Sequence, residues 1–181
     1  MPPTTTHLSS IASLHRASST WKHDTRKFGP QNALDSTSDA AWKSAPSEES
    51  DPLAYYEIYF NRPIIAHEMR IQFQGGFVGM DCIVYKKTQQ NIEREGSPKV
   101  QGRQTNDNDE EEWEELEELF VDPIDTTDIQ TFPADIEPND TKNEQSEYSC
   151  TALRIEFGRS TDFYGRIVIY SLEVWGVEAE K

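Results

Sequence analysis

Alternation of apolar and polar residues at a spacing of two is the feature that most limits how this chain can fold. Residues 69–74 (Met-Arg-Ile-Gln-Phe-Gln) alternate strictly, and residues 153–157 alternate again near the C-terminus. Successive side chains of a strand point to opposite faces, so this pattern predicts half-buried β-strands. Runs rich in aromatic and β-branched residues lie at 55–60, 82–85 and 167–176. Many short strands without βαβ alternation predict an all-β sandwich or barrel.

Polar segments flank and interrupt these strands within a chain of 181 residues, which is the length of one domain. The Ser- and Thr-rich residues 1–16 are expected to be a flexible N-terminus, which leaves 17–178 as the folded domain. Asn61, Arg62 and Pro63 are expected to separate two strands. Residues 88–111 contain almost no apolar side chain, so burial cannot offset their ordering entropy. We therefore predict a disordered acidic insertion at about 88–111.

Residues 113–121 carry a different periodicity. Trp113, Leu116, Leu119 and Phe120 are spaced at i, i+3, i+6 and i+7. This spacing places them on one stripe of a helix. Periodicity alone therefore predicts an amphipathic helix here.

Charge excludes several classes of partner. The chain has 33 acids and 17 bases, a net charge of −16. Residues 107–122 hold ten of the acids and no base, which leaves 23 acids against 17 bases elsewhere. A general basic footprint for nucleic acid is absent, and binding to anionic membranes is disfavoured. The acidic segment is either a solvated loop or a contact for a basic partner.

Motifs that carry enzyme chemistry are missing from the sequence. It contains no Gly-x-Ser-x-Gly elbow, no HExxH helix and no glycine-rich phosphate loop. Cys82 and Cys150 are the only cysteines, and no histidine stands at metal-ligand spacing from either. No secretory signal or apolar run of about 18 residues is present, so we expect two reduced, buried thiols. The sequence predicts neither an enzyme nor a metal centre.

Three clusters combine glycine with charged and aromatic residues at expected loops or strand ends. They are residues 25–29, 74–77 and 158–166. One interpretation is structural, because glycines permit tight corners and aromatics close the ends of a barrel. The other is a recognition surface, because loops on a rigid sandwich are where binding residues concentrate.

Leu34-Asp35 followed by Trp42-Lys43-Ser44 resembles the early loop of the discoidin-like family, the galactose-binding-like jelly roll of coagulation factor C domains, and residues 172–176 resemble its closing strand. Four further motifs resemble small intracellular, nuclear-receptor-associated members of this family. They are Thr-Arg-x-Phe-Gly at 25–29, Ile-Gln-Phe-Gln-Gly-Gly-Phe at 71–77, Gln-Thr-Phe-Pro at 130–133 and the segment 161–170. The resemblance covers about residues 18–177 and is strongest to small intracellular, nuclear-receptor-associated members. It implies a jelly-roll β-sandwich of about eight strands, with a strand rather than a helix at 113–121.

The resemblance also implies a function. It indicates a non-enzymatic protein-interaction module of the nucleus or cytoplasm that regulates transcription, with a nuclear receptor or another regulatory protein as its partner. Extracellular relatives close the domain with a disulfide between its ends, where this chain has no cysteine. The alternative is a carbohydrate-binding module, by analogy of fold.

Calcium is expected to bind weakly or not at all. Calcium-binding relatives carry an acid where this chain has Ser171, and calcium prefers several oxygen ligands that include carboxylates. Asp35 and Asp39 are the acids that remain near the corresponding site. No other cofactor is expected.

The resemblance places the early loops and the loop before the last strand at one end of the sandwich. Arg26 or Arg166 is expected to pair with Asp162, because an Arg–carboxylate pair fixes the shape of a loop. We expect Asp162 and Phe163 to be structural, and Arg159 and Tyr164 to be free for contact. The predicted partner-binding residues are Arg26, Phe28, Trp42, Arg159, Asp162, Tyr164 and Arg166.

Overall fold

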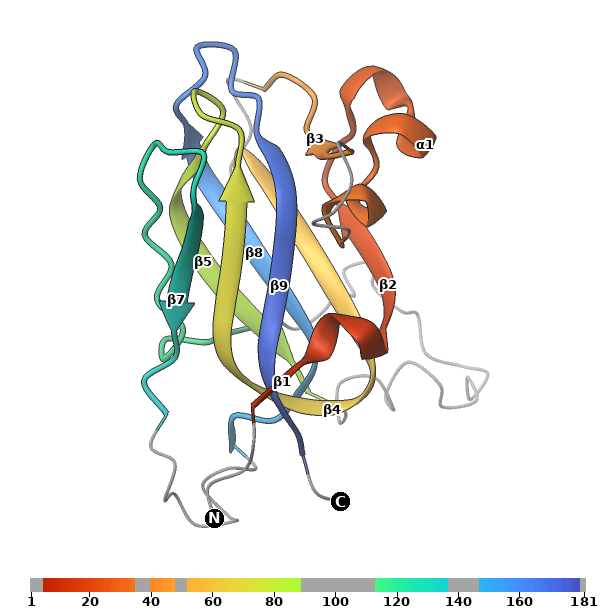
Figure 1. The fold of residues 1–181 in the computed structure, drawn as a ribbon, viewed down its shortest axis with the longest axis vertical. Coiled ribbons are helices and arrows are strands. Elements are labelled where there is room, and N and C mark those ends of the chain that lie inside the picture. The colour runs from red at the N-terminus through yellow and green to blue at the C-terminus, as the bar shows by residue number, and fades with distance from the viewer. Residues whose placement is uncertain (1–4, 35–39, 48–51, 89–112, 137–146, 180–181) are drawn as a thin grey trace, which may run out of the picture.

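Strand β4 (Ala54–Phe73) runs through both layers of a β-sandwich (Figure 1). The computed structural model describes residues 5–34, 40–47, 52–88, 113–136 and 147–179. The strands are β1 (Thr6–His7), β2 (Ala12–Ala17), β3 (Trp42–Lys43), β4, β5 (Gly79–Lys87), β6 (Glu114–Glu115), β7 (Ile129–Pro133), β8 (Cys150–Ser160) and β9 (Val168–Glu178). The helical elements are η1 (Leu8–Ile11), η2 (Trp21–His23), α1 (Thr25–Phe28) and η3 (Pro30–Leu34).

All strand pairs are antiparallel, and the halves of β4 have different neighbours. The first half pairs with β2 and β8, and β8 continues to β5 and β6. The second half pairs with β7 and β9, and β9 pairs with β1 and β3. This arrangement confirms the predicted all-β sandwich and the five predicted strand regions. The expected break at 61–63 is wrong, because the strand bends there and shifts register between Tyr59 and Ile64.

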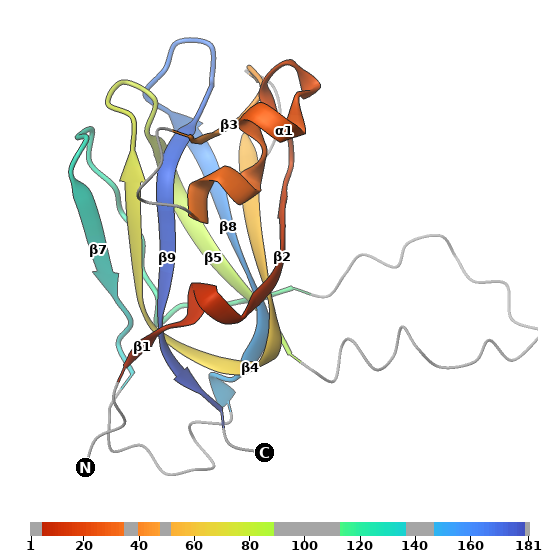
Figure 2. The same ribbon diagram turned by 45° about the vertical axis from the view of Figure 1, so that its right-hand side comes forward.

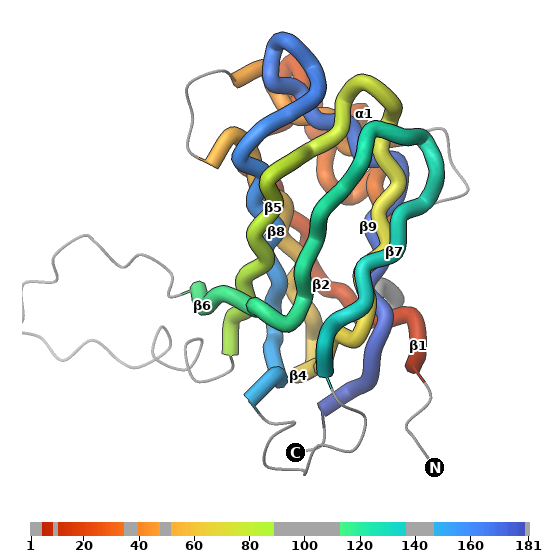
Figure 3. Tube along the Cα trace, turned by 90° about the vertical axis from the view of Figure 1, so that its left-hand side faces the viewer, coloured from red at the N-terminus to blue at the C-terminus, as the bar shows by residue number. Residues whose placement is uncertain are grey.

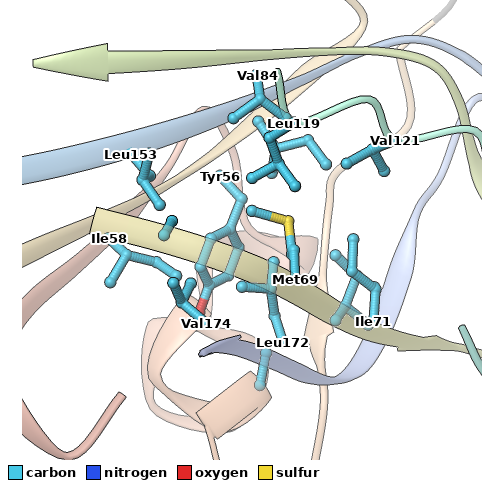
Figure 4. Close-up of a cluster of buried hydrophobic side chains, with 14 of the residues drawn as sticks. Tyr56, Ile58, Met69, Ile71, Val84, Leu119, Val121, Leu153, Leu172 and Val174 are labelled. Atoms are coloured by element: carbon cyan, nitrogen blue, oxygen red, sulfur yellow. The ribbon is translucent and has the colours of Figure 1, made fainter. Parts of the chain in front are cut away.

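The core lies between the two layers, as alternation along the strands requires. Tyr56, Met69 and Ile71 of β4 are at most 1% exposed. Figure 4 shows them meeting side chains from β5, β8 and β9. Each large apolar side chain buried in this way contributes about 1.5–3 kcal/mol relative to exposure. The buried Tyr56 hydroxyl donates a hydrogen bond to the Pro30 carbonyl at 2.6 Å, so its polar atom is satisfied.

The N-terminal segment forms part of the sandwich. The expectation that residues 1–16 are flexible is therefore wrong from Thr6 onward. β1 pairs with β9, and β2 pairs with β4 along the edge of one layer. Leu8 between them is only 2% exposed. Backbone pairing and one buried side chain therefore order a segment whose composition alone indicates flexibility.

Residues 113–121 form neither the helix that periodicity predicts nor the strand that the family resemblance implies. Only Glu114 and Glu115 pair as a strand, with β5. The Leu116 amide then donates to the Val84 carbonyl at 2.8 Å, and the Leu119 amide donates to the Leu116 carbonyl across a turn. Leu116 and Leu119 are nevertheless buried in the core. A turn can thus bury two apolar residues that are three positions apart, which is a spacing that a helix also produces.

The ends of the predicted insertion lie next to each other on the sheet. Lys86 of β5 pairs with Glu114 of β6. Lys87 holds its ammonium 5.9 Å from the centre of the Trp113 ring. The prediction of disorder itself concerns residues that lie outside those the structure describes.

Both cysteines are free, as the sequence predicts. Cys150 is buried and Cys82 is half-buried. Burial raises the pKa of each thiol to about 12, so both are protonated near neutral pH. Among the described residues, no helix is long and apolar enough to span a membrane.

Candidate functional site

Several loops meet at the end of the sandwich that lies away from the two termini (Figures 1 and 2). They are residues 74–78 between β4 and β5, residues 123–128 before β7, and residues 161–167 between β8 and β9. Figure 3 shows their tips together, and hydrogen bonds join them. The Gly76 amide donates to Asp125 at 2.8 Å, and the Val78 amide donates to the Thr161 hydroxyl at 2.9 Å. We call this region the loop end.

The β8–β9 loop is built around the carboxylate of Asp162. The Arg166 guanidinium donates from Nε to Oδ2 at 2.8 Å and from Nη2 to Oδ1 at 2.9 Å. The backbone amides of Tyr164 and Arg166 also donate to Oδ2, each at 3.1 Å. These hydrogen bonds, with the Arg166 guanidinium as the main cause, lower the pKa of Asp162. The predicted Arg–Asp pair is present, and Arg166 supplies its arginine.

The segment after β3 secures the other side of this loop. Ser44 exchanges hydrogen bonds with Ile167, since its amide donates at 2.9 Å and its hydroxyl accepts at 2.8 Å. The Ser47 amide donates to the Tyr164 carbonyl at 3.1 Å. Gly165 has φ +70°, and a Cβ there would lie 1.8 Å from the Ser47 carbonyl oxygen. Only glycine fits this position, so the loop has one tightly defined path.

Two aromatic side chains project from this fixed loop into solvent. Phe163 is 84% exposed and Tyr164 is 54% exposed. Their rings contact each other edge to face, with centroids 5.3 Å apart. Tyr164 is accessible as predicted, whereas the expectation that Phe163 is a structural plug is wrong. A rigid loop thus presents both rings for contact.

Arg166 joins the β8–β9 loop to its neighbours. Its Cζ atom lies 5.0 Å from the centre of the Phe77 ring, 5.4 Å from that of Tyr164 and 5.5 Å from that of Trp21. Arg166 therefore works as a structural centre of the loop end, with its charge already paired to Asp162. The sequence motifs at 74–77 and 158–166 do meet, and η2 joins them through Trp21.

Arg159 forms a second, more exposed ion pair near the start of the loop. Its Nε and Nη2 atoms donate to Asp81 at 2.8 and 3.1 Å. The two side chains are 61% and 58% exposed. The hydrogen bond from Arg159 lowers the pKa of Asp81. Arg159 is accessible to a partner, as predicted.

The remaining predicted residues differ in their accessibility. Arg26 is exposed on α1, and Phe28 beside it is half-buried. Trp42 is fully buried, and its Nε1 donates to the Ser19 carbonyl at 3.1 Å. Its ring packs edge to face on Tyr56, so a contact role for Trp42 is wrong. Trp42 supports the loop end from within the core.

Other features of the loop end carry no clear signal in the sequence. An open depression of about 350 Å³ adjoins the β8–β9 loop. Its lining includes Ser47 and Leu53, which also surround Gly165. Asp81 also shapes the site, yet it lies outside the three clusters that stand out by composition. Only their contacts in the folded chain identify them.

No group of three or more His, Cys, Asp or Glu side chains that could hold a metal ion occurs among the described residues. Ser171, on which the expectation of weak calcium binding rests, is 2% exposed. Asp35 and Asp39 lie outside the part of the chain that the structure describes.

Solved structures of discoidin-like domains share this fold. The F5/8 type C domain of a Bacteroides fragilis protein superposes with a TM-score of 0.62 at 12% identity, covering 96% of this chain and 97% of that one. The family 32 carbohydrate-binding module of Clostridium perfringens NanJ, solved with galactose, gives a TM-score of 0.57 at 10% identity, covering 95% and 99%. At these identities the likeness concerns the fold alone. It confirms the discoidin-like, galactose-binding-like architecture.

Curated relatives of similar sequence carry one name. Nuclear receptor 2C2-associated protein of Danio rerio is 30% identical over 161 residues, which is 89% of each chain. The Homo sapiens protein of that name is 29% identical over 162 residues, again 89% of each chain. No family model matches the sequence. The identity and two-sided coverage show that this chain belongs to the nuclear receptor 2C2-associated protein family.

Proposed function

We propose that this protein is a non-enzymatic interaction module that binds a protein partner through its loop end. The observation that carries the proposal is the exposed Phe163–Tyr164 pair on a loop fixed by Asp162 and Gly165. Exposed aromatic side chains on a rigid support lose little conformational freedom when a partner covers them. Aromatic and arginine side chains also supply most of the binding free energy at protein interfaces. Tyr164 contacts Phe163, and Arg159 near the end of β8 supplies the second type.

The names of the relatives suggest the class of partner. They describe association with nuclear receptor 2C2, so a nuclear receptor or a related regulatory protein is the partner that we propose. Regulation of transcription, in the nucleus or the cytoplasm, is the role that follows from such a partner. Neither Arg159 nor Arg166 is a free cation, since each is paired with an aspartate. Apolar contact by the two rings is therefore the main source of affinity in this proposal.

Carbohydrate binding is the alternative function. It is favoured by the carbohydrate-binding modules among the structural neighbours, such as the chitosan-binding module of a Paenibacillus chitosanase/glucanase, which has a TM-score of 0.61. A glycan array separates the two functions. Saturable binding to one glycan class, together with no binding to the receptor, would support the alternative.

The direct test is binding of purified nuclear receptor 2C2 to the full chain, measured by surface plasmon resonance. The double variant Phe163→Ala/Tyr164→Ala should lose at least about tenfold in affinity while its melting temperature stays unchanged, because both rings are exposed. Phe120→Ala is the matched control, because Phe120 is 72% exposed but lies in the segment between β6 and β7. Equal affinity of all three proteins, or no binding by the wild type, would overturn the proposal.

A further inference from the structure

The helical elements η2 and α1 and the strand β3 lie beside the loop end (Figure 2), and together they carry four basic residues. They are Lys22, Arg26, Lys27 and Lys43. The first three are exposed, and Lys43 is half-buried. We call these four side chains, together with the Trp21 and Phe28 rings, the basic corner.

The basic corner differs from the rest of a chain whose net charge is −16. Among the pairs that the described residues form, six other basic side chains lie within salt-bridge distance of a carboxylate, namely Arg62, Arg70, Lys86, Arg154, Arg159 and Arg166. Arg16 instead lies over the Tyr59 ring. None of the four at the basic corner has such a partner among the described residues. Asp24, the acid nearest in sequence, is used to cap α1 by accepting from the Lys27 amide at 3.0 Å. Asp35 and Asp39 follow later in the chain, outside the described ranges.

Aromatic rings lie close to three of these four cations. The ammonium groups of Lys27 and Lys43 lie 5.2 and 5.3 Å from the centre of the Phe28 ring. The ammonium of Lys22 lies 5.8 Å from the centre of the Trp21 ring. A ring face attracts a cation without neutralising it, so the N–H donors remain available to an anion. The basic corner is thus a set of pre-positioned donors around partly exposed apolar surface.

The backbone beneath the basic corner is unfavourable for its residue types. Lys22 has φ +55° and His23 has φ +56°, both in the left-handed region although neither is glycine. Each such residue costs about 1–2 kcal/mol. Such conformations persist only where the surrounding fold maintains them, and they concentrate at binding and catalytic sites.

We propose that the basic corner binds an acidic segment of a protein partner, with carboxylates on Lys22, Arg26, Lys27 and Lys43 and an apolar side chain against Phe28. This proposal rests on the proposed function and adds a second contact region beside the Phe163–Tyr164 pair. A polypeptide is favoured over nucleic acid or an anionic membrane because the net charge of −16 repels extended polyanions. A short peptide at the corner feels mainly the charges within about 8 Å, the screening length at physiological salt.

The test is fluorescence anisotropy of the full chain with a labelled synthetic peptide of alternating Glu and Leu residues. The Lys27→Gln/Lys43→Gln variant should bind this peptide at least about tenfold more weakly than the wild type. Arg16→Gln/Arg62→Gln is the control, since it removes the same charge from two exposed positions on β2 and on the bend of β4. A peptide with every Glu replaced by Gln should not bind, and added salt should weaken the binding of the Glu peptide.

Several results would overturn the inference. They are equal binding by the two double variants, no binding of the Glu peptide to the wild type, or equal binding of the Gln peptide. Tighter binding of phosphatidylserine vesicles or of single-stranded DNA than of the Glu peptide would also overturn it, in favour of a membrane or nucleic acid. The receptor measurement separates this inference from the proposed function. If the basic corner does not bind the peptide but Phe163→Ala/Tyr164→Ala still weakens receptor binding, the inference fails and the proposed function stands.

Discussion

Asp162→Ala removes the carboxylate around which the β8–β9 loop is built. Asp162 accepts four hydrogen bonds, two from the Arg166 guanidinium and two from backbone amides. The two side chains are only 10% and 27% exposed, so water replaces the lost contacts poorly. Hydrogen bonds to charged groups contribute about 1.5–3 kcal/mol each and are not additive. We expect a loss of about 2–4 kcal/mol in the free energy of unfolding. In a chain of this size that corresponds to about 5–15 °C in melting temperature.

Arg159→Ala is the matched comparison, because it removes the other Arg–Asp pair of the loop end. Both side chains of that pair are about 60% exposed, and surface pairs of this kind contribute little. The melting temperature of the Arg159→Ala variant should therefore equal that of the wild type. Calorimetry of the three proteins at pH 7 makes the comparison. Equal losses in both variants, or no loss in Asp162→Ala, would refute the assignment of Asp162 as the structural centre of the loop.

The pH dependence of the same variants gives a second check. Hydrogen bonding to Arg166 lowers the pKa of Asp162 below its usual value of 3.8. The folded state therefore binds fewer protons than the unfolded state at low pH. The stabilisation by Asp162 is fully present above about pH 4 and is lost as the pH falls through the lowered pKa. The difference in stability between the wild type and Asp162→Ala should shrink below about pH 4, and a constant difference would contradict the pairing.

Four further outcomes follow from named positions. Gly165→Ala should cost about 2–4 kcal/mol in urea unfolding, because it combines a positive φ with a backbone clash, whereas Gly76→Ala, also at positive φ but in open space, should cost only about 1 kcal/mol. Burial lowers the pKa of His15 from 6.5 to about 4, so the stability of the fold should be full above about pH 6.5 and should decline towards pH 4. In the His15→Gln variant, the melting temperature should change less over that pH range than in the wild type. Replacing residues 88–111 with a short Gly/Ser linker should leave the melting temperature nearly unchanged, since β5 and β6 already hold both ends together. Calcium should not raise the melting temperature, because Ser171 supplies no carboxylate.

The strands could be predicted from the sequence because alternation follows directly from strand geometry. Residues 69–74 and 153–157 illustrate this, since each alternates and each lies in a two-layer sheet with one buried face. The continuity of β4 through Pro63 could not be predicted from the sequence, because a bend between layers tolerates the hydrogen bond that proline cannot donate to the ladder. The order at Thr6–Ala17 depends on pairing with distant strands, which composition does not reveal.

The candidate site was predictable where its contacts are local in sequence. The Asp162–Arg166 pair lies within one loop, so its spacing alone limits the possible partners. Trp42 and Phe163 show the opposite case, because an aromatic side chain near a loop can point into the core or into solvent. Trp42 is buried and Phe163 is 84% exposed, the reverse of what was expected. Residue type gives the chemistry of a site, and only the tertiary fold decides which side chains are accessible.

Hydrogen exchange of the full chain with and without purified nuclear receptor 2C2 tests the central proposal most directly. If the partner covers the loop end, backbone amides of residues 159–166 and 74–78 should gain protection in the complex. The strand β1 and the bend of β4 should exchange as in the free protein, because they lie at the opposite end of the sandwich from the loop end (Figure 1). Protection confined to that opposite end, or to the outer faces of the sheets, would contradict binding through the loop end.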